Sequence, residues 1–382
     1  MVFEPFLRSL EDDAIATLQR LVETGSFTHD RGGVVRLGGM VEELFSPLGF
    51  GTRRVRSVTE DCGDHLVLTH GGGDDTLLMV AHLDTVYPTT FPWRVEGSWI
   101  HGPGVCDIKG GIVTMWMILR ALAEHAPARF EKVTWKLLFN ATEEGGCADF
   151  PELARAEVTP GTVACLIYEP GIREGDATSI AVQRKGSGRF LVEAFGREAH
   201  SGHAHEQGAN AIRELARVVE RIESRTDYER EITFNVGVIE GGTTVNTVPA
   251  HAGCQVDTRA WNTEDFAWAR KQVLAQAGEG SVQGCRVEVK ERPGYPPWPA
   301  NPESAQLGEL IAACGRELGQ TVLPQRRRGG SDGCHLWDLL PTVDGLGPIG
   351  RDPHCPGREA VDRASFVPRA LLSLAVLEKL VP

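Results

Sequence analysis

The chain of 382 residues contains 41% hydrophobic and 7% aromatic residues and has a formal net charge of −13. This length and composition predict a globular protein with room for two domains and a substantial core. The negative charge excludes nucleic acid and an anionic membrane surface as expected partners, because both repel an acidic protein.

The N-terminal residues carry early acidic side chains and no apolar core of signal-peptide length, and no stretch approaches the length of a membrane span. The nine cysteines form an odd number without a CxxC pair, which favours reduced thiols over a disulfide framework. We therefore expect a cytoplasmic protein.

The first part of the chain alternates between helical and strand patterns. These patterns predict helices over 11–23, 35–48 and 112–124 and strands over 66–68, 77–81, 133–140 and 163–168. The first two strands are separated by a short run rich in glycine and aspartate, which is typical of a hairpin with a loose turn. The alternation predicts the α/β fold class, with a mixed sheet flanked by helices.

A different pattern follows Gly171. Alternating strand-like segments and amphipathic helices occur in β-α-β-β-α order, which predicts a smaller inserted α+β domain. The proline-rich segment 293–299 marks the return to the first domain, and two more helices are predicted over 303–319 and 365–380. We therefore expect a main domain made of 1–178 and 291–382 and an inserted domain made of 179–290.

Three apolar strands of the main domain end in histidine or carboxylate residues. The first ends at His82 and is followed by Asp84, the second precedes Glu143 and Glu144, and the third precedes Glu169. Because ligands of open α/β sheets bind at the carboxyl ends of strands, we expect these side chains to lie close together. Imidazole and carboxylate groups suit zinc-like ions, and one of two adjacent glutamates could act as a base while the other binds metal.

Several motifs carry a resemblance to a known family. They are, in order, HLDTV, GPGVCDIKGG, ATEEGG and YEPG. Together they resemble the zinc-dependent amidohydrolase family of carboxypeptidases, aminoacylases and desuccinylases, and HLDTVY, FPWRVEG, HGPG and YEPG are most similar to its glutamate carboxypeptidase branch. The resemblance implies two Zn²⁺ ions, a site that Co²⁺ or Mn²⁺ also fits. It assigns Asp107 as the bridging ligand, His82 and Glu169 to one ion, and Glu144 and His354 to the other.

The resemblance also assigns roles around the metals. It implies that Glu143 is the general base and that Asp84 orients His82. The peptide bond after Asp107 is expected to be cis. The main domain is then catalytic, and the inserted domain is a lid that forms a homodimer. In that dimer His200 would reach a neighbouring active site and donate a hydrogen bond to the substrate carbonyl.

Substrate-binding positions follow from the same resemblance. Asn246 and Arg259 match lid positions that hold a substrate carboxylate, a role that suits the paired donors of arginine. Gly330 and Ser331 lie in a segment similar to a substrate-binding turn, whose backbone donors can bind an anion. The expected enzyme is a metallo-carboxypeptidase or amidohydrolase that releases a C-terminal amino acid, glutamate first among the candidates, from a small peptide or N-acyl substrate.

Other interpretations remain open at this point. The runner-up is an N-acyl amino acid deacylase or desuccinylase, because the motifs define the bond type better than the acyl group. A catalytically inactive binding relative would lack a ligand or the base, and neither is missing; a nucleotide-binding protein is excluded because the glycine-rich stretch lacks a phosphate-loop Lys-Ser/Thr. The cysteines beside the proposed ligands, which could also bind metal as thiolates, are Cys106, Cys147 and Cys355. The tryptophans that could line an aromatic pocket or simply pack are Trp93, Trp298 and Trp337.

Overall fold

The computed structural model describes residues 2–146 and 148–381. The chain forms two compact units, unit 1 (Met1–Gln183, Ala300–Arg327 and Ser331–Pro382) and unit 2 (Arg184–Pro299 and Arg328–Gly330). Unit 2 starts and ends later than the expected inserted domain at 179–290. Residues 179–183 continue strand β9 (Ala177–Arg184), which pairs with β8 of unit 1, and residues 291–295 complete strand β16 (Arg286–Tyr295) of the unit 2 sheet.

A six-stranded mixed sheet forms the centre of unit 1. Its order is β1-β2-β6-β3-β7-β18, in which β3 lies parallel to both β6 and β7, and β1 and β2 are antiparallel at one edge. The strands are β1 (Gly51–Arg56), β2 (Asp64–His70), β3 (Thr76–His82), β6 (Thr134–Asn140), β7 (Thr162–Ile167) and β18 (Thr342–Val343). The mixed α/β class expected from the sequence is confirmed.

The expected hairpin between residues 66–68 and 77–81 is wrong. Strand β6 lies between β2 and β3, so these two strands are not paired with each other. Their connection passes close to the start of β6: a Cβ atom on Gly71 would lie 2.1 Å from the carbonyl oxygen of Val133, and one on Gly73 would lie 1.5 Å from that of Lys132. The glycines therefore allow the chain to cross another strand closely rather than to turn back on itself.

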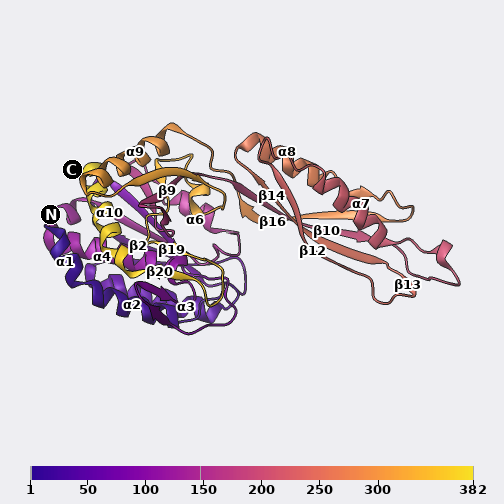
Figure 1. The fold of residues 1–382 in the computed structure, drawn as a ribbon, viewed down its shortest axis with the longest axis horizontal. Helices are drawn as coiled ribbons and strands as arrows, with labels where there is room; N and C mark the ends of the chain where they lie inside the picture. The colour runs from indigo at the N-terminus through magenta and orange to yellow at the C-terminus, as the bar shows by residue number, and fades with distance from the viewer. Residues whose placement is uncertain (1, 147, 382) are drawn as a thin grey trace. The chain divides into compact units, whose positions relative to one another are not determined.

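Helices cover both faces of this sheet (Figure 1). On β3, Leu77 and Met79 pack into the larger core with helices α2, α3, α4 and α10, whereas Leu78 and Val80 pack into a second core with α6. This two-sided burial explains the unbroken apolar run of β3. The helices of unit 1 are α1 (Phe3–Ser9), α2 (Glu11–Glu23), α3 (Arg31–Phe45), α4 (Gly110–His125), α5 (Pro127–Lys132), α6 (Phe150–Ala156), α9 (Pro302–Glu317) and α10 (Phe366–Leu380).

Two small sheets complete unit 1. One joins β17 (Val322–Arg327), β9 and β8 (Ile172–Glu174), and the other joins β19 (Gly350–Arg351), β20 (Ala360–Asp362), β5 (Trp99–His101) and β4 (Arg94–Glu96). The second sheet places the loop between β19 and β20 beside the five-residue turn η2 (Val105–Lys109), which leads into α4. The peptide bond between Asp107 and Ile108 in this turn is cis, as the sequence led us to expect.

Unit 2 contains a five-stranded antiparallel sheet with helices on one face (Figure 1). The strand order is β12 (Thr233–Gly241), β14 (His251–Ala260), β10 (Gly186–Phe195), β16 and β15 (Gly278–Glu279), and the helices are α7 (Ala211–Glu223) and α8 (Thr263–Leu274). A two-stranded ribbon of β11 (Ala199–His200) and β13 (Thr247–Val248) extends beyond the sheet. Within the described residues, no helix combines the length and apolar character that a membrane crossing requires.

Candidate metal centre

Strand ends of the central sheet bring most of the predicted metal ligands together. His82 is the last residue of β3, Glu144 follows β6 and Glu169 follows β7. The turn η2 contributes Asp107, and the loop after β19 contributes His354. The donor atoms of His82, Asp107 and Glu169 all lie within 4.8 Å of one another, and so do those of Asp107, Glu144 and His354.

Asp107 is common to both donor sets, and its two carboxylate oxygens face different histidines. Oδ1 lies 3.0 Å from Nε2 of His82, while Oδ2 lies 3.2 Å from Nε2 of His354. Glu169 Oε1 lies 3.5 Å from the His82 nitrogen, and Glu144 Oε1 lies 3.1 Å from the His354 nitrogen. This arrangement fits two cations that share one bridging carboxylate.

The electrostatics of the cluster indicate that it needs positive charge. Burial, followed by repulsion from neighbouring carboxylates, raises the pKa of Glu143 and Glu169 well above the usual range and that of Glu144 to about 7. Burial acts the same way on Asp107, but hydrogen bonds from His354 and His82 outweigh it and lower the pKa of this carboxyl. Several carboxylates buried together fit divalent cations, which favour their charged forms.

The two histidines are oriented by different means. His82 is buried, and its Nδ1 donates to the backbone carbonyl of Asp84 at 3.0 Å, which directs Nε2 at the cluster. His354 is about half exposed and has a positive φ of 61°, a conformation that costs a non-glycine residue of order 1–3 kcal/mol. Hydrogen bonds to Asp107 and Glu144 hold its ring and raise its pKa to about 11.

The carboxylate of Asp84 has a further structural role. It accepts hydrogen bonds from the backbone N–H groups of Glu143 and Glu144, at 3.0 and 3.1 Å, and from the hydroxyl of Thr28 at 2.7 Å. Asp84 contacts His82 through its backbone oxygen, and its side chain is 3.6 Å from the His82 ring. The predicted histidine-orienting residue therefore also fixes the loop that carries the predicted base.

Glu359 is a positioning residue whose role was not predicted from the sequence. Its buried carboxylate accepts from the backbone N–H groups of Gly104, Cys106 and Asp107, at 3.1, 3.0 and 3.1 Å, and from the Tyr87 hydroxyl at 2.6 Å. It thereby holds the turn that presents Asp107. Its position after His354 was visible in the sequence, but its burial and the distant partners of its carboxylate were not.

Two of the three cysteines considered as thiolate ligands lie within the described residues. The thiol of Cys106 approaches the carbonyl of Arg351 at 3.8 Å, and that of Cys355 accepts from Arg358 at 3.2 Å. Neither belongs to the two donor sets built around Asp107. Cys147 lies outside the described residues.

Unit 2 places His200 and Asn246 next to each other. They lie on neighbouring segments of the β11–β13 ribbon, where the backbone N–H of Ser201 donates to the carbonyl of Asn246 at 3.0 Å. Nδ1 of His200 accepts from the backbone N–H groups of Gly202 and His203, at 3.1 and 3.3 Å. The neutral ring therefore carries its proton on Nε2, and this exposed N–H is available as a donor.

Arg259 lies near the C-terminal end of strand β14 (His251–Ala260). It is eight residues beyond His251 along β14, which corresponds to roughly 27 Å in an extended strand. The structure therefore does not bring Asn246 and Arg259 together within one chain. Two hydrogen bonds to Asp257, from Nε at 2.7 Å and from Nη2 at 3.0 Å, fix the orientation of the Arg259 guanidinium.

The two residues of the expected substrate-binding turn are closely packed. A Cβ atom on Gly330 would lie 2.6 Å from the ring of Tyr295. The buried hydroxyl of Ser331 donates to Asp344 at 2.6 Å and accepts from the backbone N–H of Gly333 at 3.3 Å. Of the tryptophans considered for a pocket, Trp298 is fully buried, which favours the packing interpretation for this side chain.

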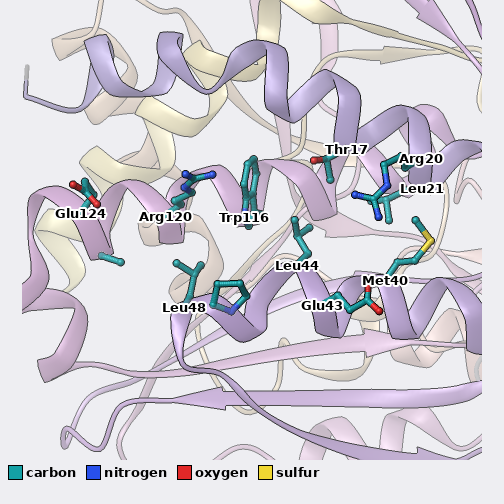
Figure 2. Close-up of a pocket in the computed structure, with 12 residues that line it drawn as sticks. Thr17, Arg20, Leu21, Met40, Glu43, Leu44, Leu48, Trp116, Arg120 and Glu124 are labelled. Carbon is teal, nitrogen blue, oxygen red and sulfur yellow. The ribbon is translucent and has the colours of Figure 1, made fainter.

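A separate cavity of about 610 Å³ lies among the outer helices of unit 1 (Figure 2). Leu21 of α2, Leu44 of α3 and Trp116 of α4 line it, and Arg120 lies over the Trp116 ring at 5.2 Å from its centroid. None of the residues predicted for catalysis, metal binding or substrate binding lines this cavity.

Comparison with known proteins agrees with the geometry of the cluster. The chain is 30% identical to carboxypeptidase G2 of Pseudomonas sp. (strain RS-16) over 370 residues, which cover 95% of this chain and 88% of the relative. It is 24% identical to succinyl-diaminopimelate desuccinylase of Dinoroseobacter shibae over 371 residues, covering 90% and 92%. The fold matches that of a dinuclear metal-binding peptidase from Bacillus subtilis, with a TM-score of 0.66, 14% identity and coverage of 98% and 99%. A model of the peptidase family M20/M25/M40 matches residues 78–379, so the chain belongs to this family of hydrolases.

Proposed function

We propose that this enzyme is a dinuclear zinc-dependent amide hydrolase that releases a C-terminal amino acid, with glutamate favoured, from peptides or N-acyl amino acids. The observation that supports it most directly is the pair of donor sets sharing Asp107, with one of its oxygens facing His82 and the other facing His354. The 30% identity to carboxypeptidase G2 favours the carboxypeptidase assignment.

The metals would be held by the residues of the two sets. His82 and Glu169 would bind one ion, Glu144 and His354 the other, and Asp107 both. Two such ions would polarise the scissile carbonyl and lower the pKa of the attacking water. Nitrogen and oxygen donors suit zinc, and they also suit cobalt and manganese.

The proton transfers belong to Glu143 in this proposal. Its backbone is held by Asp84 next to the metal ligand Glu144, and burial raises its pKa well above the usual range. A base with a raised pKa takes a proton from the attacking water and later returns it to the leaving nitrogen, as amide hydrolysis requires. His200 would donate its Nε2–H to the carbonyl oxygen as negative charge develops there. Arg259 would hold the free carboxylate of the substrate.

We further propose a homodimer formed through unit 2. Strand β12 is an edge of the five-stranded sheet, and its Val238 and Ile239 are 50% and 60% exposed. An exposed edge strand with apolar side chains is a ready site for pairing with another strand. In such a dimer His200 and Asn246 of one protomer would serve the catalytic centre of its partner, which accounts for their separation from Arg259 within one chain.

The test is hydrolysis of a panel of N-acyl-glutamates, N-acyl-aspartates, N-acyl amino acids with neutral side chains, and N-succinyl-diaminopimelate, after chelation and after zinc or cobalt is added back. We expect no turnover after chelation and restored turnover with metal, fastest for the acyl-glutamates. If the metal-restored enzyme prefers another substrate of the panel, the deacylase or desuccinylase alternative is favoured instead. Turnover that survives complete metal removal would contradict the mechanism.

A further inference from the structure

A separate cluster of metal-donor side chains lies in unit 1 and shares no residue with the main centre. Its members are His29, Asp61 and Cys62, whose donor atoms all lie within 4.8 Å of one another. Nδ1 of His29 lies 2.8 Å from Oδ2 of Asp61, and the thiol of Cys62 lies 3.8 Å from Oδ1 of the same carboxylate. The cluster therefore combines one nitrogen, one oxygen and one sulfur donor.

The histidine of this cluster stands on a well-anchored segment. Thr28 donates its hydroxyl to Asp84 at 2.7 Å, and its backbone N–H donates to the carbonyl of Thr85 at 3.1 Å. The Phe27 ring packs edge-on against the His29 ring, with 5.5 Å between centroids. These contacts limit the movement of the imidazole, although its side chain is about half exposed.

The other two donors come from a turn that is tied to helix α3. Arg31 donates from Nη1 to the backbone carbonyl of Cys62 at 2.7 Å and from Nη2 to Asp64 at 2.6 Å. The backbone N–H of Cys62 donates to the carbonyl of Thr59 at 3.1 Å, which closes the turn. The buried thiol and the exposed carboxylate of Asp61 are thereby presented on the same side as His29.

We propose that His29, Asp61 and Cys62 bind a zinc-class divalent cation, with water in the remaining position. Three protein ligands with an open fourth position are a common arrangement for zinc, and a thiolate selects zinc-like ions over magnesium or calcium. An ordinary surface ion pair between His29 and Asp61 would contribute little and would not involve the thiol.

Binding requires a proton exchange at the thiol. Burial, with negative charges of Asp61 and Asp84 nearby, raises the pKa of Cys62 to about 12, so the thiol is protonated without metal. The cation replaces this proton, a sulfur–metal bond forms, and the proton passes to solvent. The negative charges that disfavour the free thiolate attract the cation.

Cobalt(II) distinguishes this site from the main centre, since a thiolate bound to cobalt absorbs in the near ultraviolet and the donor sets around Asp107 contain only nitrogen and oxygen. The full-length protein is stripped with chelator, loaded with cobalt(II) and compared with C62S, H29A and the control C355S. We expect the thiolate band in the parent and in C355S, its loss in C62S, and one metal ion fewer per chain in both C62S and H29A.

Absence of a thiolate band in the cobalt-loaded parent protein would overturn the proposal. A band that survives C62S but disappears in C355S or C147S would also overturn it, because the thiolate would then come from a cysteine close in sequence to the ligands of the main centre. H29A keeps the test informative if C62S is destabilised, since His29 is about half exposed and its replacement leaves no buried cavity. The thiolate band and the metal content do not depend on which amide the enzyme hydrolyses.

Discussion

The donor sets around Asp107 in unit 1 and the β11–β13 ribbon of unit 2, which carries His200, hold their functional groups in opposite ways. Around Asp107 and His82 the side chains are largely buried, and further buried groups such as Glu359 fix their backbone. His200 is exposed and is oriented by two backbone N–H groups of its own turn. The first region is preorganised for cations on its own, whereas the donor of the second becomes strong only where another surface excludes water.

The largest effect is expected from E143Q, which removes the proposed base from the preorganised region. Loss of proton transfer lowers turnover by about 10²–10⁴-fold, since general base catalysis contributes on this scale. The metal content of the variant stays at the parent value, because the amide keeps the shape of the side chain and the metal ligands are untouched. Turnover and metal content are measured on the same preparation.

The matched control is E144Q, at the adjacent position. One donor atom of each glutamate lies within 4.8 Å of a ring nitrogen of His82, so geometry alone allows either to ligate. Glu144 contacts His354 at 3.1 Å and belongs to a donor set with Asp107, and we therefore expect E144Q to lose metal as well as turnover. A loss of metal in E143Q with retention in E144Q would exchange the two roles.

H200A tests the exposed region and is expected to have the second largest effect. Removing one donor to the developing oxyanion lowers kcat by about 10²–10³-fold. KM and metal content change little, because His200 is proposed to act on the transition state and is not one of the proposed metal ligands. Steady-state kinetics with the best substrate of the panel measure both constants.

A mixture of the E143Q and H200A variants tests whether His200 acts in the active site of its own chain or in that of the partner. If His200 serves the partner's site, a mixed dimer contains one site with both groups, so random reassortment restores about a quarter of the parent activity. If the histidine acts within its own chain, every site lacks one group and the mixture stays inactive. The latter result would contradict the proposal that His200 serves the partner's site.

D84N tests the hydrogen bonds by which Asp84 holds the loop of Glu143 and Glu144. The substitution turns one carboxylate oxygen into an NH2 donor, so one of the two backbone N–H groups, of Glu143 or of Glu144, loses its acceptor. We expect turnover to fall by about 10–100-fold, the range for groups that support metal ligands. T28V removes only the hydroxyl that contacts Asp84 and should have a smaller effect. Equal activity of D84N and the parent would show that the loop is held by other contacts.

The buried region was the more predictable of the two. Strand ends marked by His82, Glu144 and Glu169 converge because the carboxyl ends of parallel strands share one sheet edge. The hairpin prediction failed because local sequence does not show that β6 inserts between β2 and β3, a pairing set by residues more than fifty positions away. The positioning role of Glu359 was not predicted for the same reason, since its hydrogen-bond partners Gly104 and Cys106 are distant in sequence.

R259K is expected to give the smallest effect and the sharpest contrast within unit 2. Asp257 already occupies Nε and Nη2 of the guanidinium, which leaves Nη1 to bind a substrate carboxylate in a fixed direction. Lysine keeps the charge but cannot satisfy both carboxylates in this geometry, so KM for an acyl-glutamate rises roughly tenfold, equivalent to ~1.4 kcal/mol, with kcat little changed. D257N should raise KM less than R259K, because it loosens the orientation and leaves the guanidinium in place. A fall in kcat as large as that of H200A, at unchanged KM, would instead mean that Arg259 stabilises the transition state and that both ends of unit 2 take part in the chemical step.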